Sequence, residues 1–120
     1  MTDRVPAGEW GQQIGYSRAV RSGNVIEVAG TTAPGDSAYD QARAALVVIE
    51  NALSELGASL DDVVRTRMFV VDIERNGDDV GRAHGEVFGD IRPASGMYGV
   101  TGLLRPRMLV EIEATAIVAT

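Results

Sequence analysis

Glu111 is the side chain of this sequence best suited to acid–base chemistry if it lies in a cleft between subunits. Partial burial raises the pKa of a carboxyl group, and a raised pKa suits proton transfer to or from a bound water. The alternative is a structural carboxylate that pairs with an arginine across an interface. Glu113, on the same strand face, is expected to be structural. Glu111 is therefore the candidate general acid or base.

A second group of candidates could hold an anionic ligand. Tyr16 and Arg18 are two residues apart in a predicted strand, so their side chains share one face. If Tyr16 lines a cleft, Arg18 can reach the same place. Arg92, directly before Pro93, is the other candidate for binding a carboxylate. The competing interpretation places both arginines on the surface or in ion pairs between subunits.

The single histidine, His84, lies on the apolar face of a predicted helix, between Val80 and Phe88. A lone histidine on such a face is more often a hydrogen-bonded packing residue than a catalyst. With no second histidine and no cysteine, no metal site is predicted. Trp10 is expected either to pack over a cleft mouth or simply to anchor the start of the chain.

Composition excludes several mechanisms. All eleven basic residues are arginine, so a Schiff-base lysine, a P-loop lysine and a lysine general base are absent. With no cysteine, thiolate catalysis and disulfides are absent too. The net charge of −6 disfavours nucleic acid as a partner. No apolar run is long enough to span a bilayer and the start has no signal-like segment, so we expect a soluble, cytoplasmic protein.

The hydrophobic pattern predicts one domain, residues 1–120, with the element order ββαβαββ. Residues 38–56 form the clearest helix, because apolar residues recur there at spacings of three and four. The expected elements are an irregular lead-in at 1–14, strands at 16–23, 24–30, 61–73, 96–101 and 108–119, a turn at 74–79, and helices at 38–56 and 79–89.

This order predicts an α+β fold, a two-layer sandwich with both helices on one face of a sheet. The last strand indicates what covers the other face. Its alternate residues from Met108 to Val118 are all apolar, whereas the opposite set mixes Glu111 and Glu113 with apolar residues. Such a mixed face suits a subunit interface that contains a polar site, so we expect a homo-oligomer.

Five segments of the sequence form a recognisable series, namely GYSRAV, VAGTTA, VVRTRMFVVDI, RAHGEVFGDIRPASGMYGV and MLVEIEATA. In order and spacing they resemble the Rid family (reactive intermediate deaminase, or YjgF-like), historically called endoribonuclease L-PSP. The resemblance covers residues 14–119. It implies a chorismate-mutase-like fold and a homotrimer whose sheets pack around the threefold axis, with clefts between neighbouring subunits. It also implies hydrolysis of small enamines or imines to a 2-oxo acid and ammonia, without a metal or cofactor.

The sequence departs from the family pattern where the substrate carboxylate is held. Active deaminases carry Pro-Ala-Arg, whereas this chain has Pro93-Ala94-Ser95. Met97 replaces a common cysteine, and Ala29 replaces a small hydroxyl residue. The resemblance makes Glu111 and Tyr16 the catalytic candidates. The substrate-binding candidates are Arg18, Gly30, Thr31, Arg92, Ala94, Ser95 and Met97, with His84, Phe88 and Trp10 as possible additions.

Loss of the arginine should remove a contact of about 1.5–3 kcal/mol, so we expect little or no activity on the usual 2-imino acids. The leading hypothesis is a cofactor-free hydrolase or deaminase-type enzyme acting on an imine, an enamine or a related carbonyl metabolite. The alternative is a trimer that binds a small ligand or a partner protein without turnover. The acidic charge disfavours the historical ribonuclease activity.

Overall fold

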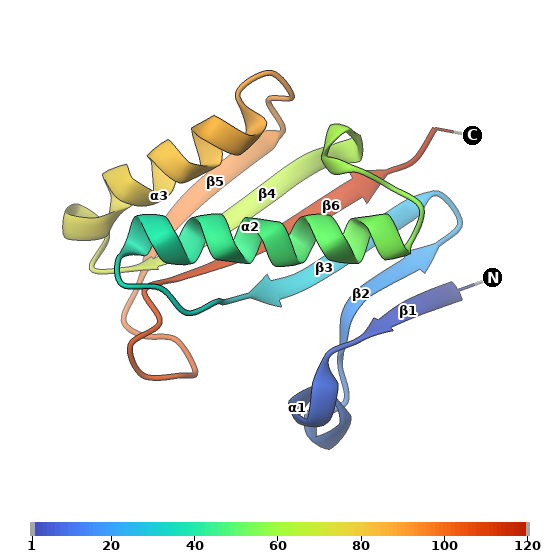
Figure 1. The fold of residues 1–120 in the computed structure, drawn as a ribbon, viewed down its shortest axis with the longest axis horizontal. Coiled ribbons are helices and arrows are strands. Elements are labelled where there is room, and N and C mark those ends of the chain that lie inside the picture. The colour runs from blue at the N-terminus through green and yellow to red at the C-terminus, as the bar shows by residue number, and fades with distance from the viewer. Residues whose placement is uncertain (1, 120) are drawn as a thin grey trace.

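A mixed six-stranded sheet with two helices against one face forms the body of the molecule (Figure 1). The computed structural model describes residues 2–119. The strand order is β1-β2-β3-β6-β4-β5, and only β4 and β5 run parallel. The strands are β1 (Thr2–Pro6), β2 (Ser17–Ser22), β3 (Val25–Thr31), β4 (Val63–Val71), β5 (Ala94–Val100) and β6 (Val110–Ile117). The helices are α1 (Gly8–Ile14), α2 (Ala38–Glu55) and α3 (Ile73–Phe88), with a 3₁₀ turn at Leu60–Asp62. The predicted α+β fold class is confirmed.

The longest helix, α2, follows from its amphipathic pattern and from its cap. The Ser37 hydroxyl accepts a hydrogen bond from the Asp40 backbone N–H at 3.1 Å, which satisfies one of the free donors at the helix start. The predicted apolar stripe is buried against the sheet; it comprises Ala42, Ala45, Leu46, Ile49, Ala52 and Leu53. Burial of this stripe supplies most of the contact between the two layers.

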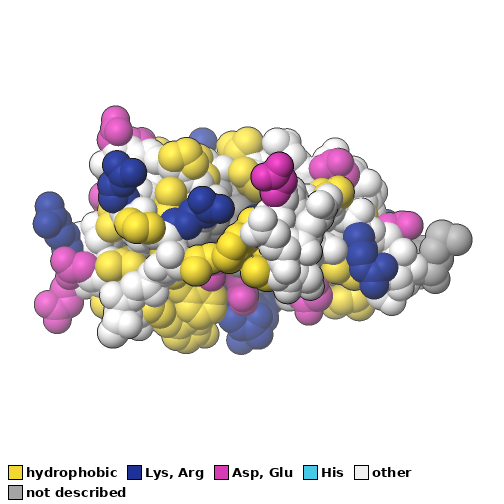
Figure 2. All heavy atoms as spheres, turned by 90° about the horizontal axis from the view of Figure 1, so that it is seen from below, with side chains coloured by type: hydrophobic (Ala, Val, Ile, Leu, Met, Phe, Trp, Pro, Cys, Tyr) yellow, Lys and Arg dark blue, Asp and Glu magenta, His cyan; other side chains and the backbone are white. Residues whose placement is uncertain are grey.

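The two faces of the sheet differ as the last strand predicts. On the helix side of β6, Val110, Ile112 and Ala114 are buried. On the other side, Glu111 and Glu113 are only half-buried, and no helix covers them. We call this uncovered side the open face. The molecule is 19 Å thick along its shortest axis, as expected for two layers. Figure 2 shows this flat shape from its edge, with hydrophobic patches between charged side chains.

The prediction of an irregular lead-in at 1–14 was wrong for the residues that the structure describes; Met1 lies outside them. Residues 2–6 form β1, which pairs with β2 at the sheet edge. Pro6 is tolerated there because it is the last residue of an edge strand. Residues 8–14 form α1, which ends where Gly15 adopts a φ of 83°.

The second predicted helix starts earlier than expected, at Ile73 rather than at residue 79. The segment ERNGDD resembles a turn in sequence, yet Asn76 is buried and its side chain donates to the Val71 carbonyl at 2.8 Å. A Cβ added at Gly77 would lie 3.6 Å from the Met97 sulfur, an ordinary van der Waals distance, so this part of α3 packs directly against β5. Within residues 2–119, no helix is long and apolar enough to cross a membrane.

Candidate active site

The candidate site is built around a bulge in β3. Val28 pairs with Ala114 and Thr31 pairs with Ile112, so Ala29 and Gly30 together oppose a single residue of β6. The pairing of β3 with β2 also ends at Val28. A bulge bends its strand and turns side chains and carbonyls away from the regular ladder. Here it directs the backbone of Gly30 toward the open face, beside Glu111.

Glu111 lies directly over Gly30. A Cβ added to Gly30 would be 2.6 Å from the carboxylate Oε2 of Glu111 and 2.7 Å from its Cδ, so only a glycine leaves room for the carboxylate. Burial raises the pKa of Glu111 above its ordinary value, and the nearby negative charge of Glu113 raises it further. The positive charge of Arg18 acts in the opposite direction. The result is a carboxyl group that keeps its proton to a higher pH than an ordinary glutamate, which suits it to proton exchange.

Arg18 forms the wall beside this carboxyl group. Its Nη2 donates to the carbonyl oxygen of Gly30 at 2.8 Å, so the bulge fixes the guanidinium. Its Nε is buried and has no hydrogen-bond partner among the described residues. The guanidinium carbon lies 5.8 Å from the centre of the Tyr16 ring, within range of a cation–π contact. The predicted common face of Tyr16 and Arg18 is therefore present.

A pocket of about 220 Å³ joins these residues. Five predicted site residues line it, namely Trp10, Tyr16, Arg18, Gly30 and Glu111. The sequence interpretation missed Ala7, Thr32, Leu104 and Arg105, which line it too. Arg105 belongs to GLLRPR, which in sequence only interrupts two strands. The sequence signal that could have identified Arg105 is its position just before the strand that carries Glu111. We call this cavity the Glu111 pocket.

The turn before β5 lies elsewhere in the chain. β5 is the edge strand, and β4 separates it from β6. The Ser95 hydroxyl lies 2.7 Å from Thr66 Oγ1 and donates to the Pro93 carbonyl at 3.0 Å. Thr66 is buried on the helix side of the sheet. Within one chain, Ser95 therefore belongs to a polar cluster on the helix side and does not line the Glu111 pocket.

His84 completes this second cluster. Its Nε2 lies 2.8 Å from Thr66 Oγ1, and its ring centre is 4.7 Å from that of buried Phe88. Burial lowers the pKa of His84, so the imidazole is neutral at pH 7. These contacts match those of a hydrogen-bonded packing residue. We call Thr66, His84 and Ser95 the Thr66 cluster.

The remaining predicted residues lie outside the Glu111 pocket. Thr31 is buried and its hydroxyl donates to the Ala29 carbonyl at 2.7 Å. Arg92 is exposed, has a φ of 55°, and donates to the Gly89 carbonyl at 3.2 Å. Ala94 is exposed at the start of β5, and Met97 packs beneath α3. Within one chain, these four residues thus have structural surroundings and no shared cavity.

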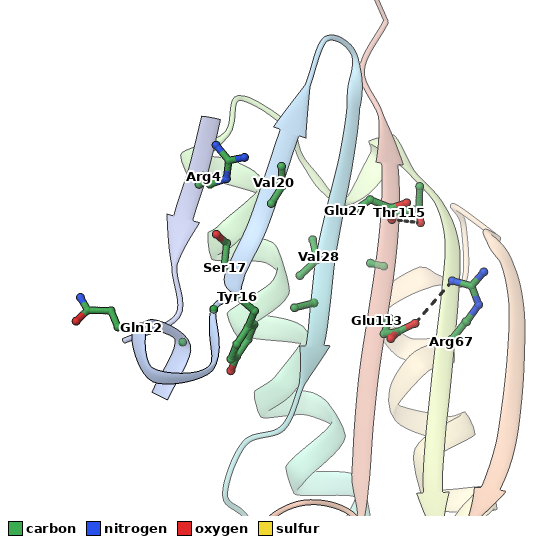
Figure 3. A pocket seen from close by; sticks show the side chains of 14 residues that line it. Arg4, Gln12, Tyr16, Ser17, Val20, Glu27, Val28, Arg67, Glu113 and Thr115 are labelled. Atoms are coloured by element: carbon green, nitrogen blue, oxygen red, sulfur yellow. Dashed lines mark hydrogen bonds and ion pairs between the residues drawn. The ribbon is translucent and has the colours of Figure 1, made fainter. Parts of the chain in front are cut away.

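A wider hollow of about 740 Å³ extends across the open face, from β1 to β4 (Figure 3). Tyr16 lines both this hollow and the Glu111 pocket. Glu113 lines the hollow and forms an ion pair with Arg67 of the same chain at 3.7 Å. Among the described residues, no three His, Cys, Asp or Glu side chains gather as metal ligands.

Comparisons with known proteins agree with this architecture. The family model described as endoribonuclease L-PSP matches residues 10–118. The crystal structure of Rv2704 from Mycobacterium tuberculosis, a member of the YjgF/YER057c/UK114 family, is 50% identical, with a TM-score of 0.95 over 98% of this chain and 100% of that one. A RutC family protein of Pyrococcus abyssi is 32% identical, covering 84% of each chain. An uncharacterised protein of Streptomyces coelicolor is 37% identical over 94% of this chain and 90% of its own.

The family model spans nearly the whole chain, including the bulge in β3, the turn before β5 and the strand that carries Glu111. The M. tuberculosis structure superposes on the fold of this chain, and the two sequences are 50% identical. The chain therefore belongs to the Rid (YjgF-like) family, whose model bears the description endoribonuclease L-PSP.

Proposed function

We propose that the Glu111 pocket is the site of a cofactor-free hydrolase of the deaminase type, acting on an imine, an enamine or a related carbonyl metabolite in the cytoplasm. The observation that carries this proposal is the half-buried carboxyl group of Glu111, held over Gly30 and beside the fixed cation of Arg18. Tyr16 adds a phenol at the pocket wall. This is a set of groups for proton transfer in a small, partly dry space.

The chemistry requires a single group that can both give and accept a proton. In its neutral form Glu111 donates to the imine nitrogen, and as a carboxylate it accepts a proton from the attacking water. The water oxygen bonds to the C=N carbon and gives a carbinolamine. The carbinolamine nitrogen then takes a proton from Glu111, the C–N bond breaks and ammonia leaves, and the hydroxyl returns its one proton to the Glu111 carboxylate as the C=O bond forms. A raised pKa favours both roles.

The site differs from that of an active family deaminase in its carboxylate anchor. Ser95 stands where the family arginine is expected, and its hydroxyl already bonds Thr66 and Pro93 within the chain. We therefore propose that the usual small 2-imino acids are poor substrates. The alternative function, a trimer that binds a small ligand or a partner protein without turnover, is favoured by this same replacement.

The decisive experiment is a turnover assay with freshly generated imines and enamines, in which ammonia release is measured. Glu111→Gln should abolish release while the protein stays folded. Glu113→Gln is the matched control, because it removes the same charge from the same face of β6 outside the pocket. Release that Glu111→Gln leaves unchanged contradicts the proposed role, and no release across a broad panel supports the ligand-binding alternative.

A gain-of-function variant tests the missing anchor. Ser95→Arg should produce or increase deamination of 2-iminobutanoate if the rest of the cleft is intact. Ser95 is exposed, so a longer side chain can leave the Thr66 cluster without displacing the core. Absence of any gain would mean that the pocket has diverged beyond this one position.

We also propose a homotrimer in which the open faces of three sheets pack together. The support is the hollow of the open face, which is lined by both apolar and charged side chains (Figure 3). Val20→Asp on the open face should dissociate the trimer. Val47→Asp, on the exposed outer side of α2, should not. Sedimentation equilibrium measures both masses, and a trimeric Val20→Asp protein would contradict this interface.

A further inference from the structure

The connection between β5 and β6, residues 101–109, passes beside the Glu111 pocket and is fixed at its far end. The buried side chain of Gln41 donates to the Arg107 carbonyl at 3.1 Å and accepts from the Leu109 backbone N–H at 2.8 Å. Arg107 itself has a φ of 70°. These bonds hold the end of the connection against α2, and so they determine where the preceding residues of the loop are presented.

Arg105 lies in the free part of this loop. It lines the Glu111 pocket and also the adjoining surface of α1, near Glu9 and Trp10. Its side chain is exposed, and within residues 2–119 its guanidinium takes part in no ion pair and no hydrogen bond. By contrast, Arg18 is committed to the Gly30 carbonyl. The pocket therefore has one fixed cation and one cation free to bind a ligand.

The charges of the pocket lining favour an anion. Arg18 and Arg105 contribute two positive charges, and Glu111 contributes at most one negative charge. The lining is thus positive in a chain whose net charge is −6. Two guanidinium groups around one cavity provide donors that match a carboxylate. The volume of about 220 Å³ suits a ligand smaller than a drug-sized molecule.

We propose that Arg105 is the carboxylate anchor of the Glu111 pocket, so that a small monocarboxylate ligand is held from this chain's own β5–β6 loop and not from β5, in a position different from that of the 2-imino acids of active family deaminases. The inference rests on the proposed function, because it takes the Glu111 pocket as the site. It gives the role of binding the ligand carboxylate to a residue of this loop, because β5 contains no cationic side chain. Arg18 forms the second, fixed side of the anion site.

The test compares two probes, 2-oxobutanoate and its methyl ester, which lacks the negative charge and carries one additional methyl group. Isothermal titration calorimetry measures their affinities for the full-length protein and its variants. Arg105→Gln should weaken 2-oxobutanoate binding by roughly 10- to 150-fold and leave the ester unchanged, as expected for loss of a charge-assisted contact. Arg105→Lys should restore part of the affinity.

Arg107→Gln is the matched control. It removes the same charge from the same loop, it keeps the same kind of backbone at a positive φ, and Arg107 does not line the Glu111 pocket. It should leave both affinities unchanged. Equal losses in the two variants would show that only the net charge of the loop matters, and would overturn the assignment of Arg105.

Failure of this inference is distinguishable from failure of the proposed function. If Arg105→Gln binds 2-oxobutanoate as the unmodified protein does, or if the unmodified protein does not prefer the acid to its ester, Arg105 is not the anchor. The proposed function is judged separately, by the dependence of ammonia release on Glu111. If Glu111→Gln loses turnover and Arg105→Gln does not, the proposed function stands and the assignment of Arg105 as the anchor is wrong.

Discussion

The two faces of β6 differ in what packs against them. Toward the helices, Ile112 is fully buried among apolar side chains supplied by this chain. Toward the open face, Glu111 and Glu113 are half-buried beside cations, a pocket and a hollow. Neighbouring residues of one strand therefore serve different purposes, stability on one side and recognition on the other. Substitutions one position apart should separate these two properties.

Ile112→Ala should have the largest effect on folding. It leaves a cavity at a site with no solvent access, and we expect a loss of about 2–5 kcal/mol in the free energy of unfolding. Urea denaturation measures this loss. A loss below about 1 kcal/mol would mean that the helix-covered face does not carry the stability of the sheet.

Gly30→Ala should have the largest effect on function. The added methyl group overlaps the Glu111 carboxylate, and displacing that group by about 1 Å can cost on the order of 10²-fold in rate. We expect kcat/KM to fall by that order, or ligand affinity to fall if the protein only binds. Gly85→Ala is the control, because a Cβ at Gly85 meets nothing within 4 Å. Equal activity of the two variants would show that the bulge is not part of the active site.

The pH dependence of stability should distinguish Glu111 from an ordinary surface carboxylate. Its pKa is raised in the folded protein, so the native state binds more protons than the unfolded state above the ordinary glutamate pKa of 4.5. The contribution of Glu111 to stability is therefore lost as pH rises through the folded pKa. Glu111→Gln should gain stability relative to the unmodified protein over that range.

Urea midpoints of the two proteins between pH 4 and pH 8 give this difference directly. The pKa of His84 is lowered by burial, so its own effect runs in the other direction, with stability falling as pH drops below 6.5. Both proteins keep His84, and its contribution cancels in the comparison. A difference between the two proteins that does not change with pH would contradict a raised pKa at Glu111.

Glu113→Gln should have the smallest effect. Its ion pair with Arg67 is largely solvated, so we expect a change below about 1 kcal/mol in the free energy of unfolding. Removal of the like charge should nevertheless lower the pKa of Glu111. Carboxyl-carbon NMR of Glu111 measures that change, and an unaltered pKa would mean that the two carboxylates do not interact.

Most of the fold could be predicted from the sequence, because the spacing of its apolar residues matches the positions that are buried in the structure. The stripe of α2 and the alternation of β6 each indicate a single element, and both are present. The start of α3 was missed because ERNGDD has the local chemistry of a turn, while the contacts that make it helical come from Val71 and Met97. Tertiary contacts of this kind leave no local signal.

The candidate site was only partly predictable, for a related reason. The shared face of Tyr16 and Arg18 follows from strand geometry, and the position of Glu111 follows from alternation. Arg105 enters the pocket because a loop is held by Gln41, which lies far away in the sequence. The hydrogen bonds of Ser95 to the helix side of the sheet depend likewise on Thr66, a partner on another strand.

The bulge in β3 has a consequence for local opening. Ala29 and Gly30 have no registered partner on either neighbouring strand, whereas Val28 is paired on both sides. Amides of one strand should therefore exchange with solvent at different rates, fast at the bulge and slowly at Ile26 and Val28, where exchange requires the sheet to open. The floor of the pocket can then rearrange around a ligand while the core of the sheet stays closed.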